Sequence, residues 1–80
     1  MVEVRYFAAI ADAVGKDSER LDLPPDATVA DLRTSLAAAY GPDLDKMLAV
    51  CAYLIGDELT RDPSVALSGR VDVLPPFAGG

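Results

Sequence analysis

The sequence predicts a small α+β domain in which a mixed sheet of four or five strands is covered on one face by a main helix. Three observations lead to this prediction. Residues 2–7 alternate apolar and polar side chains, which is the period of a strand with one buried face. Residues 28–40 have the capping signal and apolar spacing of a helix. Two further strand-like segments, 49–55 and 70–74, follow this helix, so strands lie on both sides of it in the sequence.

The N-terminal third of the chain predicts two strands joined by a short helix. The first strand has apolar side chains at every second position, and Phe7 breaks its polar side. Residues 8–14 are compatible with a short helix, which Gly15 is placed to end as a C-cap. A second strand is expected at 18–23, because its leucines alternate with polar residues until two prolines stop it.

The main helix is predicted to begin at Thr28. Thr28 and Asp31 match a capping box in which Asp replaces Glu, and the negative Asp31 also suits the positive end of the helix dipole. Apolar side chains at spacings of three and four form one stripe along the helix: Val29, Leu32, Leu36 and Tyr40. Gly41 and Pro42 terminate it, and residues 43–48 are expected to add one further turn.

The C-terminal half predicts three strands. Residues 49–55 are almost continuously apolar, as expected of a strand that is buried on both faces or partly covered by a partner. Gly56 and Asp57 indicate a hairpin turn to a short strand at 58–60, and residues 70–74 form the last strand. The helix supplies the crossover needed to pair the first and last strands in parallel at the sheet centre. This arrangement is a β-grasp, ubiquitin-like fold.

Length and composition indicate one domain. The chain has 80 residues and 51% apolar residues, and no run approaches the roughly 18 apolar residues of a membrane-spanning helix. We expect a β-grasp domain over 1–76 and a flexible C-terminal Gly-Gly tail over 77–80. Because the N-terminus lacks the pattern of a secretory signal and the chain has a single cysteine, we expect a cytoplasmic protein without a membrane partner.

The charge and residue inventory exclude several classes of function. The net charge is −6 and no basic cluster is present, which argues against nucleic acid and favours a basic protein surface as partner. The chain has no histidine, so zinc-type ligand sets and histidine-assisted nucleophiles are absent. Cys51 lies in an apolar strand and is expected to be a buried, inert thiol. We therefore expect no metal site, no bound cofactor and no enzyme activity from the chain on its own.

The C-terminus is the expected place for chemistry. Gly79 and Gly80 carry no Cβ and can enter a slot that other residues would block. Pro75 and Pro76 hold the preceding backbone extended and cannot donate to a sheet. The tail is therefore suited to enter the site of another protein, although an ordinary chain end is the alternative interpretation.

A resemblance to a known family starts at this tail. Residues 73–80, Val-Leu-Pro-Pro-Phe-Ala-Gly-Gly, resemble the C-terminus of molybdopterin synthase small subunits, which commonly end in Pro-Pro, two variable residues and Gly-Gly. Residues 4–8 and 28–32 resemble the same family, so the resemblance to these MoaD/ThiS sulfur carriers covers the full length. The chain departs from the family pattern in having no Asn within 49–54 and no acidic turn at 67–70.

The resemblance implies a non-catalytic sulfur-donor subunit. In this family an adenylating enzyme uses ATP to activate the terminal carboxylate, here that of Gly80, which then becomes a thiocarboxylate. The resemblance implies that Gly80 donates sulfur to the pyranopterin precursor of the molybdenum cofactor, with Gly79 providing clearance. The implied partners are this activating enzyme and the molybdopterin synthase large subunit, in a heterotetramer of two small and two large subunits.

The residues around the tail are expected to bind the partner. We predict that a docking patch contains these residues: Phe7, Leu74, Pro75, Pro76 and Phe77. For Phe7, packing in the core is an equal alternative. Three other functions remain open: a ubiquitin-like modifier conjugated to proteins through Gly80, a sulfur carrier for thiamine or cysteine synthesis, and a plain interaction domain.

Overall fold

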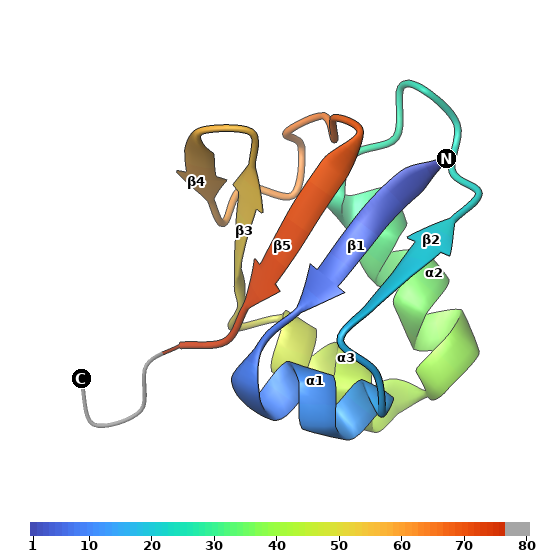
Figure 1. Cartoon of the computed structure of the whole chain (residues 1–80), viewed down its shortest axis with the longest axis vertical. Coiled ribbons are helices and arrows are strands. Elements are labelled where there is room, and N and C mark those ends of the chain that lie inside the picture. Colours follow the sequence, from blue (N-terminus) through green and yellow to red (C-terminus); the bar gives the residue numbers. More distant parts are fainter. Residues whose placement is uncertain (77–80) are drawn as a thin grey trace.

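The computed structural model describes residues 1–76, which form one five-stranded mixed sheet and three helices (Figure 1). In chain order the elements are β1 (Val2–Tyr6), α1 (Ala8–Val14), β2 (Ser18–Leu21), α2 (Val29–Tyr40), α3 (Pro42–Leu48), β3 (Ala52–Ile55), β4 (Glu58–Thr60) and β5 (Arg70–Leu74). The strand order is β2-β1-β5-β3-β4. β1 and β5 pair in parallel at the centre, and the other pairs are antiparallel. The predicted α+β, ubiquitin-like β-grasp class is confirmed.

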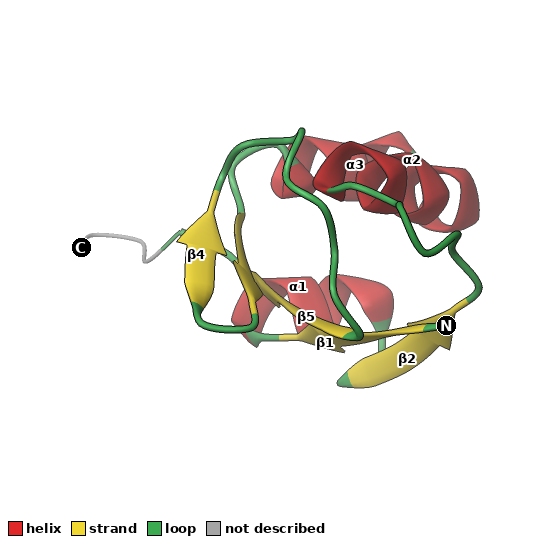
Figure 2. Cartoon of the chain, turned by 90° about the horizontal axis from the view of Figure 1, so that it is seen from above, coloured by secondary structure: helices red, strands yellow, loops and turns green. Residues whose placement is uncertain are grey.

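The helices cover one face of the sheet, as Figure 2 shows from above for α2 and α3. The short helix α1 lies beyond the ends of β1 and β5 and contacts α3 (Figure 1). The side chains of the strands that point toward the helices join the buried residues of the helices in one core: Val2, Val4, Tyr6, Ile10, Val29, Leu32, Leu36, Leu44, Leu48, Cys51, Tyr53, Ile55, Val71 and Val73. The opposite face of the sheet, called here the open face, carries the alternate strand residues.

Three segments differ from the sequence-based expectation. β2, predicted over 18–23, already ends at Leu21. Residues 43–48 form a separate helix with Pro42 rather than one added turn. The third strand begins at Ala52 rather than at 49, because the N–H groups of Val50 and Cys51 donate to carbonyls of the preceding helix. β3 is also not buried on both faces: its side chains alternate between buried and half-buried, so one side lies on the open face.

The start of α2 is confirmed as a capping box. The Thr28 N–H donates to Asp31 Oδ2 at 2.9 Å, and the Asp31 N–H donates to Thr28 Oγ1 at 3.4 Å. These two bonds satisfy N–H groups that the first turn of a helix otherwise leaves without partners. The cap fixes where the crossover helix begins, and so how it lies over the sheet.

Thr28→Ala is expected to lower the free energy of unfolding by about 1 kcal/mol, because it removes the side-chain half of the cap. Urea denaturation followed by circular dichroism measures this change. Thr34→Ala is the matched control, since Thr34 is exposed on the same helix and its hydroxyl donates to the Ala30 carbonyl within that helix. Equal losses in the two variants would contradict a specific contribution from the cap.

A second polar network joins three elements. The hydroxyls of Tyr6 and Tyr40 both donate to Glu19 Oε2, at 2.5 and 2.7 Å, and Lys16 Nζ lies 3.6 Å from Glu19 Oε1. Burial alone would raise the pKa of Glu19, but the hydrogen bonds from the two tyrosines and the nearby lysine outweigh it and lower this pKa. Burial and the contact with Glu19 raise the pKa of Tyr6 far above its usual value. Glu19 therefore connects β1, β2 and the end of α2 through charge-assisted hydrogen bonds.

Candidate functional site

The two central strands fix the point from which the tail leaves the domain. β1 and β5 run in parallel, with Tyr6 opposite Val73, so both strands end at the same edge of the sheet. The described chain continues past Leu74 through Pro75 to Pro76 at this edge (Figure 1). The predicted site residues Phe77, Gly79 and Gly80 lie outside the described residues. The structure describes the surface around Pro75 and Pro76, the residues that precede them in the chain.

An apolar patch lies on the open face next to this exit. The register places Ala52 opposite Leu74 and Leu54 opposite Leu59, on the side of the sheet away from the core. Leu59 is 61% exposed, whereas the other three side chains are half-buried. We call these four residues the leucine patch. Exposed apolar side chains that cluster in this way mark protein-binding surfaces. Of these four residues, only Leu74 was predicted from the sequence to belong to a docking patch.

Phe7 lies on the open face rather than in the core. Its side chain is half-buried and is not part of the core cluster, and the Arg5 guanidinium carbon lies 5.5 Å from its ring centroid. Tyr6 pairs with Val73, so Phe7 and Leu74 follow the last paired residues of the two central strands and lie at the same end of the sheet. The core alternative for Phe7 is wrong.

The two prolines face a different environment. Pro75 and Pro76 line an apolar hollow of about 210 Å³ together with residues of α1, of the last turn of α3 and of the segment after it: Ala9, Ile10, Met47 and Val50. The predicted docking residues therefore divide between the open face and this hollow. The hollow has no sequence signal, because three distant segments form it only in the folded chain.

Comparison with known proteins places the chain in a family. The model of the ThiS family matches residues 4–80, a range that runs from within β1 to the terminal glycines. The chain belongs to the ThiS family. The family resemblance predicted from the tail and from the first strand is thereby confirmed.

Individual relatives of this ThiS-family chain cover it almost completely. A molybdopterin synthase sulfur carrier subunit from Dictyostelium discoideum is 29% identical, and the alignment covers 98% of this chain and 94% of that protein. The solution structure of the HVO 2177 protein from Haloferax volcanii is 30% identical, with a TM-score of 0.77, and covers 99% of this chain and 85% of that one. The crystal structure of SAMP1 from the same organism is 26% identical, with a TM-score of 0.73, and covers 99% and 98%.

Cys51 takes no part in the surface of this ThiS-family protein. Its thiol is buried and donates to the Met47 carbonyl at 3.2 Å. Burial raises the pKa of the Cys51 thiol, which disfavours the reactive thiolate. The interpretation of Cys51 as a buried core thiol is confirmed.

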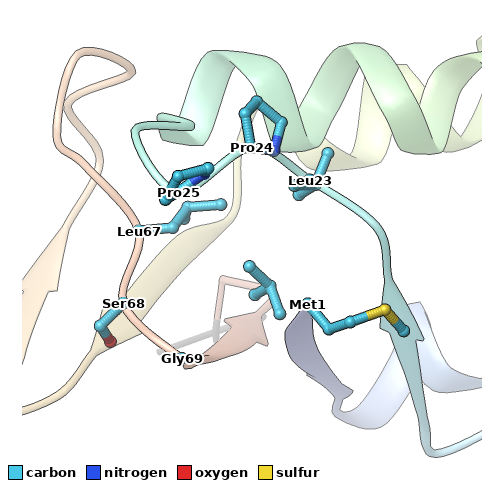
Figure 3. Close-up of a pocket in the computed structure, with 8 residues that line it drawn as sticks. Met1, Leu23, Pro24, Pro25, Leu67, Ser68 and Gly69 are labelled. Atoms are coloured by element: carbon cyan, nitrogen blue, oxygen red, sulfur yellow. The ribbon is translucent and has the colours of Figure 1, made fainter.

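A further hollow, of about 290 Å³, lies at the end of the sheet away from the tail exit (Figure 3). Met1, Leu23 and Leu67 line it together with two prolines of the loop after β2.

Within residues 1–76, no three His, Cys, Asp or Glu side chains are grouped so that they could hold a metal ion. Over the same residues, no helix is long and apolar enough to cross a membrane. The surface features at the tail exit are the leucine patch, Phe7 and the apolar hollow that Pro75 and Pro76 line.

Proposed function

We propose that this ThiS-family protein is the sulfur-carrier subunit of a molybdopterin synthase and carries a thiocarboxylate on Gly80. The observation that supports this most strongly is the family match, which extends through the terminal glycines. The similarity to the molybdopterin synthase sulfur carrier subunit of D. discoideum, which extends over nearly the whole chain, supports it further. The parallel pairing of β1 and β5 supports it as well, because it starts the tail at the sheet centre beside an exposed apolar patch.

The chemistry begins with the terminal carboxylate, which is a poor acyl donor at neutral pH because it resists nucleophilic attack and lacks a good leaving group. An adenylating enzyme joins the Gly80 carboxylate to AMP and releases pyrophosphate from ATP. A persulfide donor attacks this acyl-adenylate and displaces AMP, which gives an acyl disulfide. A second thiol cleaves the S–S bond, so that the Gly80 thiocarboxylate and a disulfide of the donor are the products. ATP is thus used by the activating enzyme, and the carrier itself needs no bound cofactor.

The thiocarboxylate then acts within the large subunit. Holding this nucleophile in a pocket beside the pyranopterin precursor replaces a bimolecular encounter by an oriented one. Gly79 gives the clearance for entry, and the large subunit supplies the acids, bases and cations of the reaction. Two transfers complete the dithiolene, which suits a heterotetramer of two small and two large subunits in the cytoplasm.

Reconstitution tests this proposal. The thiocarboxylated chain, incubated with the large subunit of its own organism and the pyranopterin precursor, is expected to give the dithiolene product in a ratio of two carriers per pterin. The unmodified chain is the control and is expected to give none. If the thiocarboxylated chain binds the large subunit but leaves the precursor unchanged, the proposed acceptor is wrong.

A protein-modifier function is the second candidate. It is favoured by the likeness to SAMP1 of H. volcanii, a small archaeal modifier protein, at 26% identity. Both functions share the fold and the adenylation step. They differ in the fate of Gly80, because a modifier forms an isopeptide bond with a lysine of a target. A carrier for thiamine or cysteine synthesis differs only in the acceptor of sulfur.

Leu59→Ser is expected to weaken binding to the large subunit by at least about fivefold, which corresponds to roughly 1 kcal/mol for an exposed anchor of an interface. The melting temperature should stay unchanged, because Leu59 is 61% exposed. Isothermal titration measures the dissociation constant. Ala39→Ser, an exposed change on α2, is the control. Equal affinities of the Leu59 variant and the control would show that the leucine patch is not part of the interface.

A further inference from the structure

The centre of the open face carries a cluster of three charged side chains. Arg5 and Asp72 lie opposite each other in the β1–β5 register, and Arg70 lies two residues before Asp72 on the same face. The Nε atoms of both arginines are 3.9 Å from Asp72 Oδ1. The Asp72 side chain is only 11% exposed, whereas those of Arg5 and Arg70 are 42% and 55% exposed. The carboxylate therefore lies beneath two guanidinium groups that solvent reaches.

This cluster is incompletely paired. A separation of 3.9 Å is too long for a hydrogen bond, and Asp72 Oδ1 has no hydrogen-bond partner among residues 1–76. One carboxylate between two guanidinium groups leaves an excess of one positive charge. Each guanidinium has five N–H donors, so both retain donors for a further acceptor. The Phe7 ring beside the Arg5 guanidinium favours its position on the sheet through a cation–π contact.

The charge of the open face is opposite to that of the whole chain. The register assigns five charged strand residues to this face, namely Glu3, Arg5, Arg20, Arg70 and Asp72. Three arginines and two carboxylates give a net charge of +1, against −6 for the chain. The overall charge predicted a basic partner surface, whereas the centre of the open face, where Arg5 and Arg70 flank Asp72, is complementary to a carboxylate.

We propose that the open face binds a partner surface on which an aspartate or glutamate side chain stands beside apolar side chains. The partner carboxylate binds the free donors of Arg5 and Arg70, and its apolar neighbours pack on the leucine patch. Arginine and carboxylate groups match in geometry and form strong charge-assisted bonds. Asp72 lies beneath the two guanidinium groups and competes with the partner carboxylate for them. The inference rests on the proposed function only in requiring a protein that acts on Gly80.

The adenylating enzyme of the same organism is the probe, because both the carrier and the modifier functions require it. The assay is ATP–pyrophosphate exchange, with an enzyme that adenylates the wild-type chain. The double variant Arg5→Gln/Arg70→Gln is expected to raise KM for the chain by about tenfold at low salt, with kcat unchanged. The difference should shrink as the salt concentration rises. Lys16→Gln/Lys46→Gln removes two positive charges elsewhere and is expected to change KM by less than about twofold.

Two further variants keep the test decisive. The double variant leaves the Asp72 carboxylate buried without a cation, which can destabilise the fold. The triple variant Arg5→Gln/Arg70→Gln/Asp72→Asn removes this buried charge and so separates misfolding from lost binding. It is expected to show the same rise in KM. Asp72→Asn alone leaves both arginines free for the partner and is expected to keep KM unchanged or lower it. A raised KM for Asp72→Asn, or an unchanged KM for the folded double and triple variants, would overturn the proposal.

Exchange does not involve sulfur, so the two proposals fail separately. If the wild-type chain is adenylated with the predicted dependence on Arg5 and Arg70 but never gains sulfur, the carrier function is wrong and the docking inference stands. If the chain gains sulfur and neither arginine affects KM, the docking inference is wrong and the carrier function stands.

Discussion

Deletion of Gly80 is expected to abolish thiocarboxylate-dependent sulfur transfer while leaving the fold and its stability unchanged. The reacting carboxylate would then belong to Gly79, about 3.5 Å short of its proper position. A displacement of about 1 Å already costs on the order of a hundredfold in rate when reacting groups are held in place. Within residues 1–76, Val73 is the last residue of the buried core cluster, so we expect the truncation to leave this cluster intact.

The comparison needs both activity and stability. The product of the reconstituted synthase is measured for the full chain and for the truncated chain, and urea denaturation is measured for both. Ala78→Ser, which keeps the length of the tail, is the control and should retain activity. Restored product formation by the truncated chain would contradict the role of Gly80.

Glu19→Ala is expected to lower the free energy of unfolding by about 2–3 kcal/mol at neutral pH, the largest effect we expect from any single polar side chain of the domain. The substitution leaves the Tyr6 and Tyr40 hydroxyls without their shared acceptor. Glu19→Gln keeps an acceptor oxygen without the charge and should recover part of the loss. Equal stability of the alanine variant and the wild type would show that water replaces Glu19 at no cost.

The contribution of Glu19 also has a predictable pH dependence. Its pKa is lowered in the folded protein, so the folded state favours the ionised carboxylate. The stabilisation is fully present above the unfolded pKa of about 4.3, and it is lost as the pH falls through the lower folded value. The stability difference between the wild type and Glu19→Gln should therefore be constant above about pH 5 and shrink in acid. A difference that grows as the pH falls would contradict the lowered pKa.

Local signals were enough to predict most elements of the fold. Thr28 and Asp31 are close in sequence, and their capping box forms as expected. Gly15 ends α1 in the left-handed conformation, at φ 86°. The hairpin between β3 and β4 and the parallel pair of β1 and β5 were also predicted. The third strand began too early in the prediction because apolar residues at 49–51 suit a helix end as well as a strand.

The surface around the tail exit was harder to predict because it depends on register. Leu54 and Leu59 belong to different strands, and only their pairing across the hairpin joins them on the open face. Arg5 and Asp72 come from opposite ends of the chain and meet only through the β1–β5 register. Net charge, which averages over all faces, concealed the positive centre of this face.

The central claim is that Gly80 carries sulfur, and intact-mass spectrometry tests it most directly. The chain is incubated with its activating enzyme, ATP and a persulfide sulfur source, and the modified residue is located by fragmentation. The sulfur-carrier account predicts a gain in mass equal to the exchange of one oxygen atom for sulfur, located at Gly80. An unchanged mass accompanied by high-mass conjugates through Gly80 would contradict it and favour the protein modifier.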